Sequence, residues 1–414
     1  MIDVLIVAYH YPPIASAGTQ RSVSFARYLP ELGFRPHVLT TNAFGSEGEG
    51  SVYRANEWVG VYRNLFNPAA RDLPPSVRSR SRTGSGQSGL SRLSRRLLIP
   101  DGQVGWLPSA YRVARSILNT HPIRLILTTG PPFSSHLLGL SLHGTTHLPW
   151  VADFRDTWTY DPLDDHLEST TVRLGIERWM EVAILRNATH VTCVTDVAAD
   201  FLKSRSGDRP VTLIPNGYEP GEVVPGSPSR AQAPVRFVHT GSFSASHPLR
   251  SPELLVRAAE KLCGEVDFEI VFVGPLTQRE RAIIQPLEDA GRALVTGAVD
   301  REEALLWQRK ADVLVVVDHP RDVLASNIPG KVYEYGATGK PILAIASRGA
   351  LRSLIREMGA GLCVGHDIDD IADAIRAFVR GEAGVSPDVG QWSRFERKRS
   401  VEKLARVFAQ ILDS

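Results

Sequence analysis

Short runs of apolar and β-branched residues alternate along the chain with longer segments in which apolar residues recur at helical spacing. This alternation is the pattern of βαβ units, in which parallel strands are buried on both faces. In the first half, strands are predicted at 4–8, 37–41, 125–129, 150–154, 191–194 and 211–214. In the second half, they are predicted at 235–239, 269–273, 293–296, 313–317, 342–345 and 361–364. The pattern predicts an α/β protein with two doubly wound, Rossmann-like parallel-sheet domains of similar size.

A stretch rich in Pro, Gly and Ser separates the two sets of strands. It covers 225–234, has the composition of a linker, and follows the turn Pro215-Asn-Gly. We therefore expect one domain at 1–215 and a second at 216–390. The remaining segment, 391–414, repeats apolar residues at helical spacing and predicts a closing amphipathic helix.

Composition and charge narrow the class of protein. The chain has 414 residues, of which 43% are apolar and 22% charged, as in ordinary globular proteins. A net charge of +2 provides no general field for binding nucleic acid. The N-terminus lacks the basic residues of a secretion signal, and no apolar run approaches the roughly 20 residues that span a bilayer. We expect a cytoplasmic protein that has no nucleic-acid partner.

An arginine- and serine-rich segment at 73–96 stands apart from this pattern. It has almost no apolar residues and cannot contribute to a core. One interpretation is a solvated loop. The other is a peripheral contact of 76–96 with an anionic membrane surface at the inner face of the membrane, or with an anionic acceptor.

The first predicted strand is followed by a turn with Gly18 just before a helix. A glycine at a helix start allows backbone N–H groups to approach an anion, so Gly18 is a candidate for ligand binding or simply a turn residue. The chain has no Gly-x-Gly-x-x-Gly or P-loop motif at this turn, which argues against dinucleotide oxidoreductases and nucleoside triphosphatases.

The strongest local motif lies between Asp318 and Pro341. Asn327 is predicted to cap a helix, and Gly339 to end it. Asn327, Lys331 and Glu334 then fall on one helical face. A helix N-terminus with a lysine suits a diphosphate, and a glutamate further along suits the two hydroxyls of a ribose. The alternative is a Lys and Glu pair that only solvates the helix.

The motif and five further segments resemble the GT4-type glycosyltransferases of the GT-B fold, along nearly the whole chain. The further segments are the Tyr11-Pro-Pro turn with Gly18, 151–158, 214–217, 239–243 ahead of Arg250, and 295–299. The resemblance implies retaining transfer of a sugar, such as a hexose, from a nucleoside diphosphate sugar to a hydroxyl acceptor, with no other cofactor. It also implies that 1–215 binds the acceptor, that 216–390 binds the donor across a cleft, and that 391–414 packs back on the first domain.

The resemblance assigns donor contacts in the second domain. Glu334 corresponds to the glutamate that holds the ribose, whereas Ser326 stands where the family has a first glutamate. Arg250 corresponds to the second of two bases on the diphosphate, and Ser242 stands in place of the first, so Lys331 would supply part of the missing charge. The remaining donor residues implied are Gly241, Gly297, Val299, Asn327 and Ile328.

The acceptor side departs further from the family. The histidine that many relatives carry is absent, and Asp153, Arg155 and Asp156 lie in that segment. Either aspartate could orient or deprotonate the acceptor hydroxyl, or pair with Arg155. Arg155 and His10 are the candidate acceptor-binding residues.

A metal site and other functions compete with this interpretation. The one Asp-x-Asp, Asp367-Ile-Asp369, fits a helix cap better than a metal site, so we predict no divalent metal requirement. The acceptor would be a small molecule or a lipid-linked sugar in cell-envelope or secondary-metabolite synthesis. The alternatives are a nucleotide-sugar epimerase of the same fold and a catalytically weak nucleotide-sugar-binding scaffold.

Overall fold

The chain forms two compact units, each built around its own parallel sheet. The computed structural model describes residues 1–14, 17–45, 50–57, 98–161, 170–223 and 234–413. Unit 1 comprises Met1–Asn216 together with Arg397–Ser414, and unit 2 comprises Gly217–Glu396. The arginine- and serine-rich segment 76–96 lies outside the described residues.

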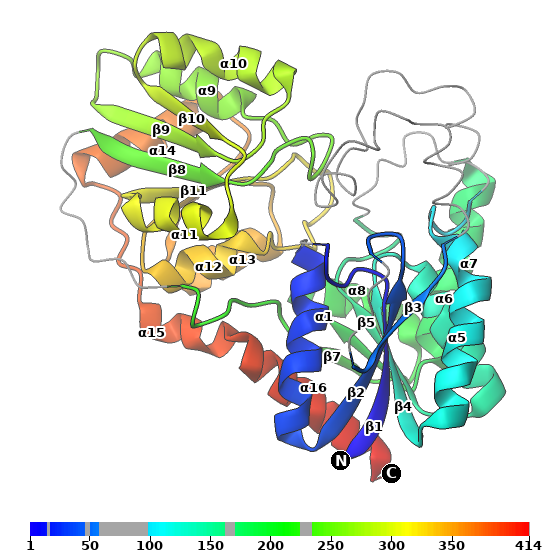
Figure 1. Cartoon of the computed structure of the whole chain (residues 1–414). Coiled ribbons are helices and arrows are strands. Elements are labelled where there is room, and N and C mark those ends of the chain that lie inside the picture. The colour runs from blue at the N-terminus through cyan, green and yellow to red at the C-terminus, as the bar shows by residue number, and fades with distance from the viewer. Residues whose placement is uncertain (15–16, 46–49, 58–97, 162–169, 224–233, 414) are drawn as a thin grey trace. The chain divides into compact units, whose positions relative to one another are not determined.

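Unit 1 contains a seven-stranded sheet in the order β3-β2-β1-β4-β5-β6-β7, in which every pairing is parallel (Figure 1). Its strands are β1 (Ile2–Ala8), β2 (Phe34–Thr41), β3 (Val52–Ala55), β4 (Ile123–Gly130), β5 (Trp150–Phe154), β6 (His190–Cys193) and β7 (Val211–Leu213). The six strands expected in this half are confirmed. The short edge strand β3 was not predicted.

Helices cover both faces of this sheet because side chains along each strand alternate between the faces. From β1, Leu5 and Val7 pack into the core beneath one set of helices: α5 (Leu107–Thr120), α6 (Ser134–Thr146), α7 (Thr171–Asn187) and α8 (Asp196–Ser206). Val4 and Ile6 face the other core, beneath α1 (Ala17–Tyr28) and the closing helix α16 (Arg397–Leu412). Short 3₁₀ turns lie at η1 (Leu29–Leu32) and η3 (Val104–Trp106).

Unit 2 repeats this architecture with six parallel strands in the order β10-β9-β8-β11-β12-β13 (Figure 1). They are β8 (Val235–Thr240), β9 (Phe268–Val273), β10 (Ala293–Gly297), β11 (Val313–Val317), β12 (Ile342–Ile345) and β13 (Gly361–Val364). All six were expected. The prediction of an α/β protein with two parallel sheets is therefore confirmed.

The helices of unit 2 again form two layers. One core lies beneath α9 (Glu253–Lys261), α10 (Gln278–Asp289) and α14 (Ile368–Arg380). The other lies beneath α11 (Arg301–Lys310), α12 (Lys331–Thr338), α13 (Ala350–Glu357), α15 (Val389–Trp392) and the turn η5 (Ser393–Phe395). Within the ranges that the structure describes, no helix has both the length and the apolar character needed to cross a bilayer.

The carboxyl ends of parallel strands meet at one edge of each sheet, and this edge is where α/β folds bind ligands. The strand order reverses between β1 and β4 in unit 1, and between β8 and β11 in unit 2. The candidate residues in unit 2 lie at the end of β10 or in the segments that follow β8, β10 and β11 in the sequence. The fold therefore places them along one edge of the second sheet.

Candidate functional site

The helix expected at Asn327 begins later, at Lys331. Gly330 stands at the N-cap position and makes no side-chain cap, so the prediction that Asn327 caps the helix is wrong. The preceding segment is held as a β-bridge between Ala325 and Gly349, and the side chain of Asn327 instead accepts a hydrogen bond from Arg321 (2.9 Å). The helix ends as expected, because Gly339 adopts the left-handed conformation at the C-cap.

Lys331 lies against the turn that follows β8. Its Nζ donates to the carbonyl of Thr240 (2.5 Å), and a Cβ on Gly241 would lie 3.4 Å from the same Nζ. Gly241 has φ +100°, a conformation that favours glycine. The structure therefore brings Lys331 and Gly241 together. Ser242 is buried beside them, and its hydroxyl pairs with Ser246 (3.0 Å).

His239, the last but one residue of β8, is buried beside Lys331 and under the influence of the Arg250 charge. It is 1% exposed, and its Nδ1–H donates to the Val315 carbonyl (3.1 Å). Its Nε2 then faces Lys331 Nζ at 3.4 Å. Burial, together with the positive charges of Lys331 and Arg250, holds the pKa of His239 well below its usual range. The positive charges of Lys331 and Arg250 thus both keep the His239 ring neutral, near the end of β8.

Arg250 is held by Asp318, a buried carboxylate just after β11. Arg250 Nε and Nη2 donate to Asp318 Oδ1 at 3.0 and 2.8 Å, and Arg321 Nη1 donates to Oδ2 at 2.5 Å. Burial alone would raise the pKa of Asp318, but the contact with His319 and the charges of the two arginines lower it well below the usual range. Asp318 is therefore ionised and fixes two guanidinium groups at the edge of the sheet.

Glu334 takes its partners from α11. Its Oε1 accepts from Arg301 Nη2 (2.9 Å), and its Oε2 accepts from Gln308 Nε2 (3.3 Å). Arg301 begins α11, shortly after Val299 and after Gly297 (φ +75°), the last residue of β10. Val299 and Ile328 pack against the same apolar core. Ser326, two residues before Ile328, is buried. Glu334 is thus linked through Arg301 to the turn after β10.

In unit 1, Asp153 is fully buried and has four hydrogen-bond donors. Arg21 donates from Nε (2.9 Å) and Nη2 (2.7 Å), and the hydroxyls of Thr129 (2.9 Å) and Thr192 (2.7 Å) donate as well. Burial alone would raise the pKa of Asp153, but the charge and hydrogen bonds of Arg21 lower it. This network joins α1 to β4, β5 and β6.

Arg155 and Gly18 are brought into contact. A Cβ on Gly18 would lie 1.8 Å from Arg155 Nη1, so any larger residue at this position in the first turn of α1 would displace the Arg155 guanidinium. Arg155 also donates from Nε to the Gly130 carbonyl (3.2 Å), and from Nη2 to the Pro131 carbonyl. Burial lowers its pKa, while the charge of Asp156, which is half-buried, raises it. His10 lies elsewhere, in edge contact with the Tyr9 ring (5.2 Å).

Several residues of these clusters were not anticipated from the sequence: Asp318 and Arg321 after β11, Arg301 and Gln308 in α11, and Arg21 in α1. The signal that could have pointed to the first two is their position directly after a buried strand. The hydrogen-bond partners of Arg21 lie more than 100 residues away, so no local sequence pattern marks it.

Asp367 caps α14 as expected. The described ranges contain no cluster of three candidate metal ligands.

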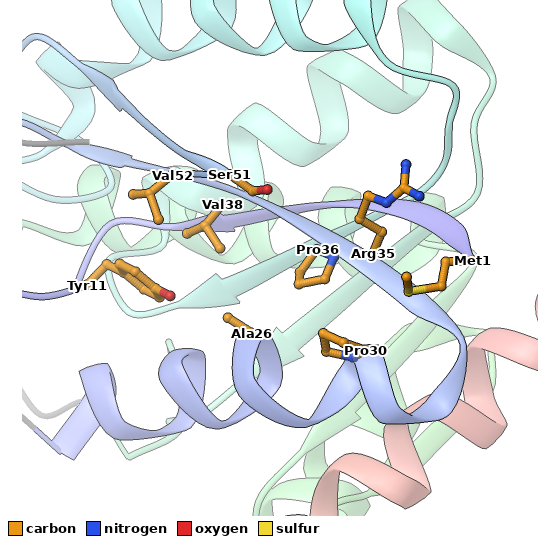
Figure 2. Close-up of a pocket in the computed structure, with 9 residues that line it drawn as sticks. All are labelled: Met1, Tyr11, Ala26, Pro30, Arg35, Pro36, Val38, Ser51 and Val52. Atoms are coloured by element: carbon orange, nitrogen blue, oxygen red, sulfur yellow. The ribbon is translucent and has the colours of Figure 1, made fainter. Parts of the chain in front are cut away.

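A separate hollow of about 330 Å³ lies in unit 1, between α1 and the strands β2 and β3 (Figure 2). Tyr11 lies at one end, with Ala26 and Pro30 on the helical side and Val38 and Val52 on the strand side. Its walls are mainly apolar, and it contains none of the residues proposed above for donor or acceptor. We assign it no role in the reaction.

Two protein-family models match the chain, one in each unit. The model described as "Glycosyl transferase 4-like domain" matches residues 16–217, and the model described as "Glycosyl transferases group 1" matches residues 234–380. The chain belongs to the group 1, GT4-like glycosyltransferases. Proteins of this family transfer a sugar from a nucleotide sugar, and the chain is accordingly a glycosyltransferase.

Solved structures agree with this glycosyltransferase fold. Sucrose-phosphate synthase from Thermosynechococcus elongatus matches with a TM-score of 0.69 and 17% identity over 100% of both chains. HepE from Anabaena, in a complex with UDP and glucose, matches with a TM-score of 0.63 and 14% identity, over 99% of this chain and 100% of its own. The UDP-GlcNAc 2-epimerase of Methanocaldococcus jannaschii has a TM-score of 0.53 and 13% identity, over 99% and 100%. At these identities the matches show a GT-B-like architecture alone. No match to a curated protein sequence was found.

Proposed function

We propose that unit 2 of this glycosyltransferase binds a nucleoside diphosphate sugar at the carboxyl edge of its sheet. The observation that carries the proposal is the pair of cations at the end of β8, where Lys331 contacts the Thr240 carbonyl and, together with Arg250, influences His239. This is the point where the strand order of the sheet reverses. A fixed pair of cations at such a point suits the diphosphate of a nucleotide sugar.

Each part of the donor then has a proposed contact. The turn with Gly297 and Val299 lies against the base, and Glu334 holds the ribose. Although Arg301 and Gln308 contact its two oxygens, each carboxylate oxygen has a further lone pair for a ribose hydroxyl. Backbone N–H groups of Ser326, Asn327 and Ile328 complete the diphosphate site with Gly241 and Ser242.

The proposed chemistry is retaining transfer of a hexose to a hydroxyl group. The C1–O bond of the donor breaks, its electron pair stays on the departing diphosphate, and the acceptor oxygen bonds to C1. Arg250 and Lys331 stabilise the charge that develops on the diphosphate, which is the task that a metal ion serves in other transferases. We therefore propose transfer without a divalent metal.

Unit 1 is proposed to bind the acceptor. Arg155 places a buried positive charge beside the start of α1 at Gly18, and His10 and Asp156 lie near the carboxyl ends of β1 and β5. Because Asp153 already accepts four hydrogen bonds, we propose that it positions Arg21 and the neighbouring strands. Asp156 is then the carboxylate that orients or deprotonates the acceptor hydroxyl. A small-molecule or lipid-linked acceptor, and a membrane contact through 76–96, remain proposals.

The test is calorimetric titration with UDP, GDP, dTDP and their sugars, beginning with UDP-glucose because a HepE structure contains it. One diphosphate is expected to bind. Arg250→Ala and Lys331→Ala should each weaken its binding about tenfold to a hundredfold, since a charge-assisted hydrogen bond contributes about 1.5–3 kcal/mol. Glu334→Ala should weaken binding of nucleotides but not of inorganic pyrophosphate.

Arg257→Ala, at an exposed site on α9, is the matched control and should bind as wild type does. Wild-type affinity in a Glu334→Ala, Lys331→Ala double variant would refute the site. A product assay separates the other functions: an epimerase converts its donor with no acceptor present, and a scaffold binds donor without turnover. An Asp156→Asn variant should bind donor normally and lose transfer.

A further inference from the structure

A second hollow of about 390 Å³ opens in unit 2 at the carboxyl ends of β11, β12 and β13. Its charged lining consists of three arginines and one aspartate: Arg321, Arg348, Arg352 and Asp322. His366 lies at its border, and Val323 and Leu324 provide exposed apolar surface. Arg321 is already paired with Asp318, which leaves Arg348 and Arg352 with Asp322 as the one carboxylate of the lining. The hollow therefore carries a net positive charge that suits an anion.

Two of the arginines retain hydrogen-bond donors for a ligand. Arg348 is exposed, and its guanidinium has no hydrogen-bond or ion-pair partner among the described residues. Arg352 donates from Nη2 to the Cys363 carbonyl (3.0 Å), which fixes the side chain while leaving most of its five N–H donors. Such planar donor groups match a carboxylate or phosphate. The start of α13 at Ala350 adds the positive end of a helix dipole.

Asp318 links this pocket to the proposed donor site. Its side chain holds Arg250 on one oxygen and Arg321 on the other, and its main-chain carbonyl accepts a hydrogen bond from His366 Nε2 (2.9 Å). Across the sheet, the residues proposed for the base follow β10, and Lys331 and Arg250 lie beside β8. The pocket comes next, at β11–β13. The pocket therefore follows the diphosphate residues on the side opposite the base.

We propose that this pocket binds a carboxylate or phosphate carried by one of the two sugar substrates, so that the enzyme selects an acidic sugar. The inference rests on the proposed donor site, because a nucleotide sugar runs in the order base, ribose, diphosphate, sugar. The anionic group belongs either to the donor sugar, as in a uronic acid, or to the acceptor. Both sources offer the same chemistry to Arg348 and Arg352.

Two titrations of the full chain distinguish the sources. In the first, the protein is titrated with UDP-glucose and with UDP-glucuronate, which differ in one carboxylate. In the second, protein saturated with UDP is titrated with glucose, glucuronate and glucose 6-phosphate. We expect the acidic member to bind at least about tenfold more tightly in one of the two titrations. If GDP or dTDP is the nucleotide that binds, its neutral and uronic sugars replace the UDP pair.

The Arg348→Gln, Arg352→Gln double variant should reduce that preference to within about twofold without changing the affinity for UDP. The single Arg348→Gln change, at an exposed side chain, should reduce it partly, so a folding defect in the double variant does not obscure the result. Arg356→Gln removes an equal charge one turn further along α13, outside the pocket, and should retain the full preference.

Equal binding of acidic and neutral sugars in both titrations would overturn the inference, as would a preference that survives in the double variant. A different result would refute the proposed donor site: the protein would bind none of the nucleoside diphosphates. In that case inorganic phosphate is titrated into the wild type and the double variant, and a loss of at least about fivefold in affinity is still expected. Equal affinity of the wild type and the double variant for phosphate would by itself refute the anion pocket.

Discussion

Asp153 and Asp318 are buried carboxylates at the carboxyl edges of their sheets, and each holds arginine side chains in place. Asp153 binds one arginine and two threonine hydroxyls, whereas Asp318 binds two arginines. A buried carboxylate is stable only when its oxygens are paired. Both carboxylates therefore act through the side chains that they fix in place.

Histidines buried without charge give the protein a predicted sensitivity to acid. Burial lowers the pKa of His136 to about 3, although the nearby Asp153 carboxylate opposes this shift. The unfolded chain takes up the proton near pH 6.5, so this histidine does not affect stability above that pH. Between about pH 6.5 and 3, the free energy of unfolding should fall by about 1.4 kcal/mol per pH unit for this group.

Urea unfolding of wild type and His136→Gln at pH 7.5, 6.0 and 5.0 measures the effect. The variant should lose stability less steeply, by about 1.4 kcal/mol per pH unit. His147→Asn removes an exposed histidine and should keep the wild-type slope. Identical slopes for wild type and His136→Gln would show that residue 136 is not buried as neutral imidazole.

Among the elements, the buried strands were the most predictable from sequence. Their apolar runs identify every strand of unit 2 and six strands of unit 1. The strand β3 was missed because Val52–Ala55 is a four-residue edge strand with only one fully buried position. The start of α12 was wrong because a tertiary contact, the bridge between Ala325 and Gly349, governs the path of the preceding loop. Sequence spacing carries no information about such a contact.

Tertiary contacts also limit how much of the candidate site could be predicted from the sequence. Lys331 and Glu334 follow from helical spacing within the motif, and Gly241 and Arg250 follow from the resemblance. Arg321 could not be selected in this way, because its place depends on how the loop between β11 and α12 folds against Asp318 and Asn327. The fold of such a loop cannot be derived from residue spacing alone.

Two helical glycines should respond in opposite ways to the same substitution. In α12, a Cβ on Gly336 would lie 2.1 Å from the Trp392 ring, so Gly336→Ala should displace α15 and cost about 1–3 kcal/mol of stability. In α7, a Cβ on Gly175 meets no atom within 4 Å, so Gly175→Ala should stabilise the protein by about 0.5–1 kcal/mol. Chemical denaturation measures both. A stabilising Gly336→Ala would show that Trp392 does not pack there.

For the whole molecule, the closing helix α16 completes the first unit. Val401, Leu404 and Phe408 are fully buried against β1, β4 and α1. Burial of each such side chain contributes about 1.5–3 kcal/mol, and together this approaches the entire stability of a typical domain. Shortening the chain to residues 1–396 should therefore unfold unit 1 and leave unit 2 intact.

Hydrogen exchange on the shortened chain measures this outcome. Amides of β1 and β4 should lose most of their protection, whereas amides of β8 and β11 should retain it. Binding of the diphosphate identified above should also survive, because every donor contact proposed in unit 2 lies between residues 241 and 334. A shortened chain with wild-type protection in β1 would contradict the packing of α16.

The return of residues 397–414 to the first unit also sets an order on biosynthesis. When the ribosome has made residues 1–216, one layer of that unit still lacks its cover, and the whole of the other unit must be translated before the cover emerges. A message with a stop codon shortly before Arg397 would thus yield a polypeptide whose flaw lies in the half that was made earlier, where Val4 and Ile6 would lack their apolar partners.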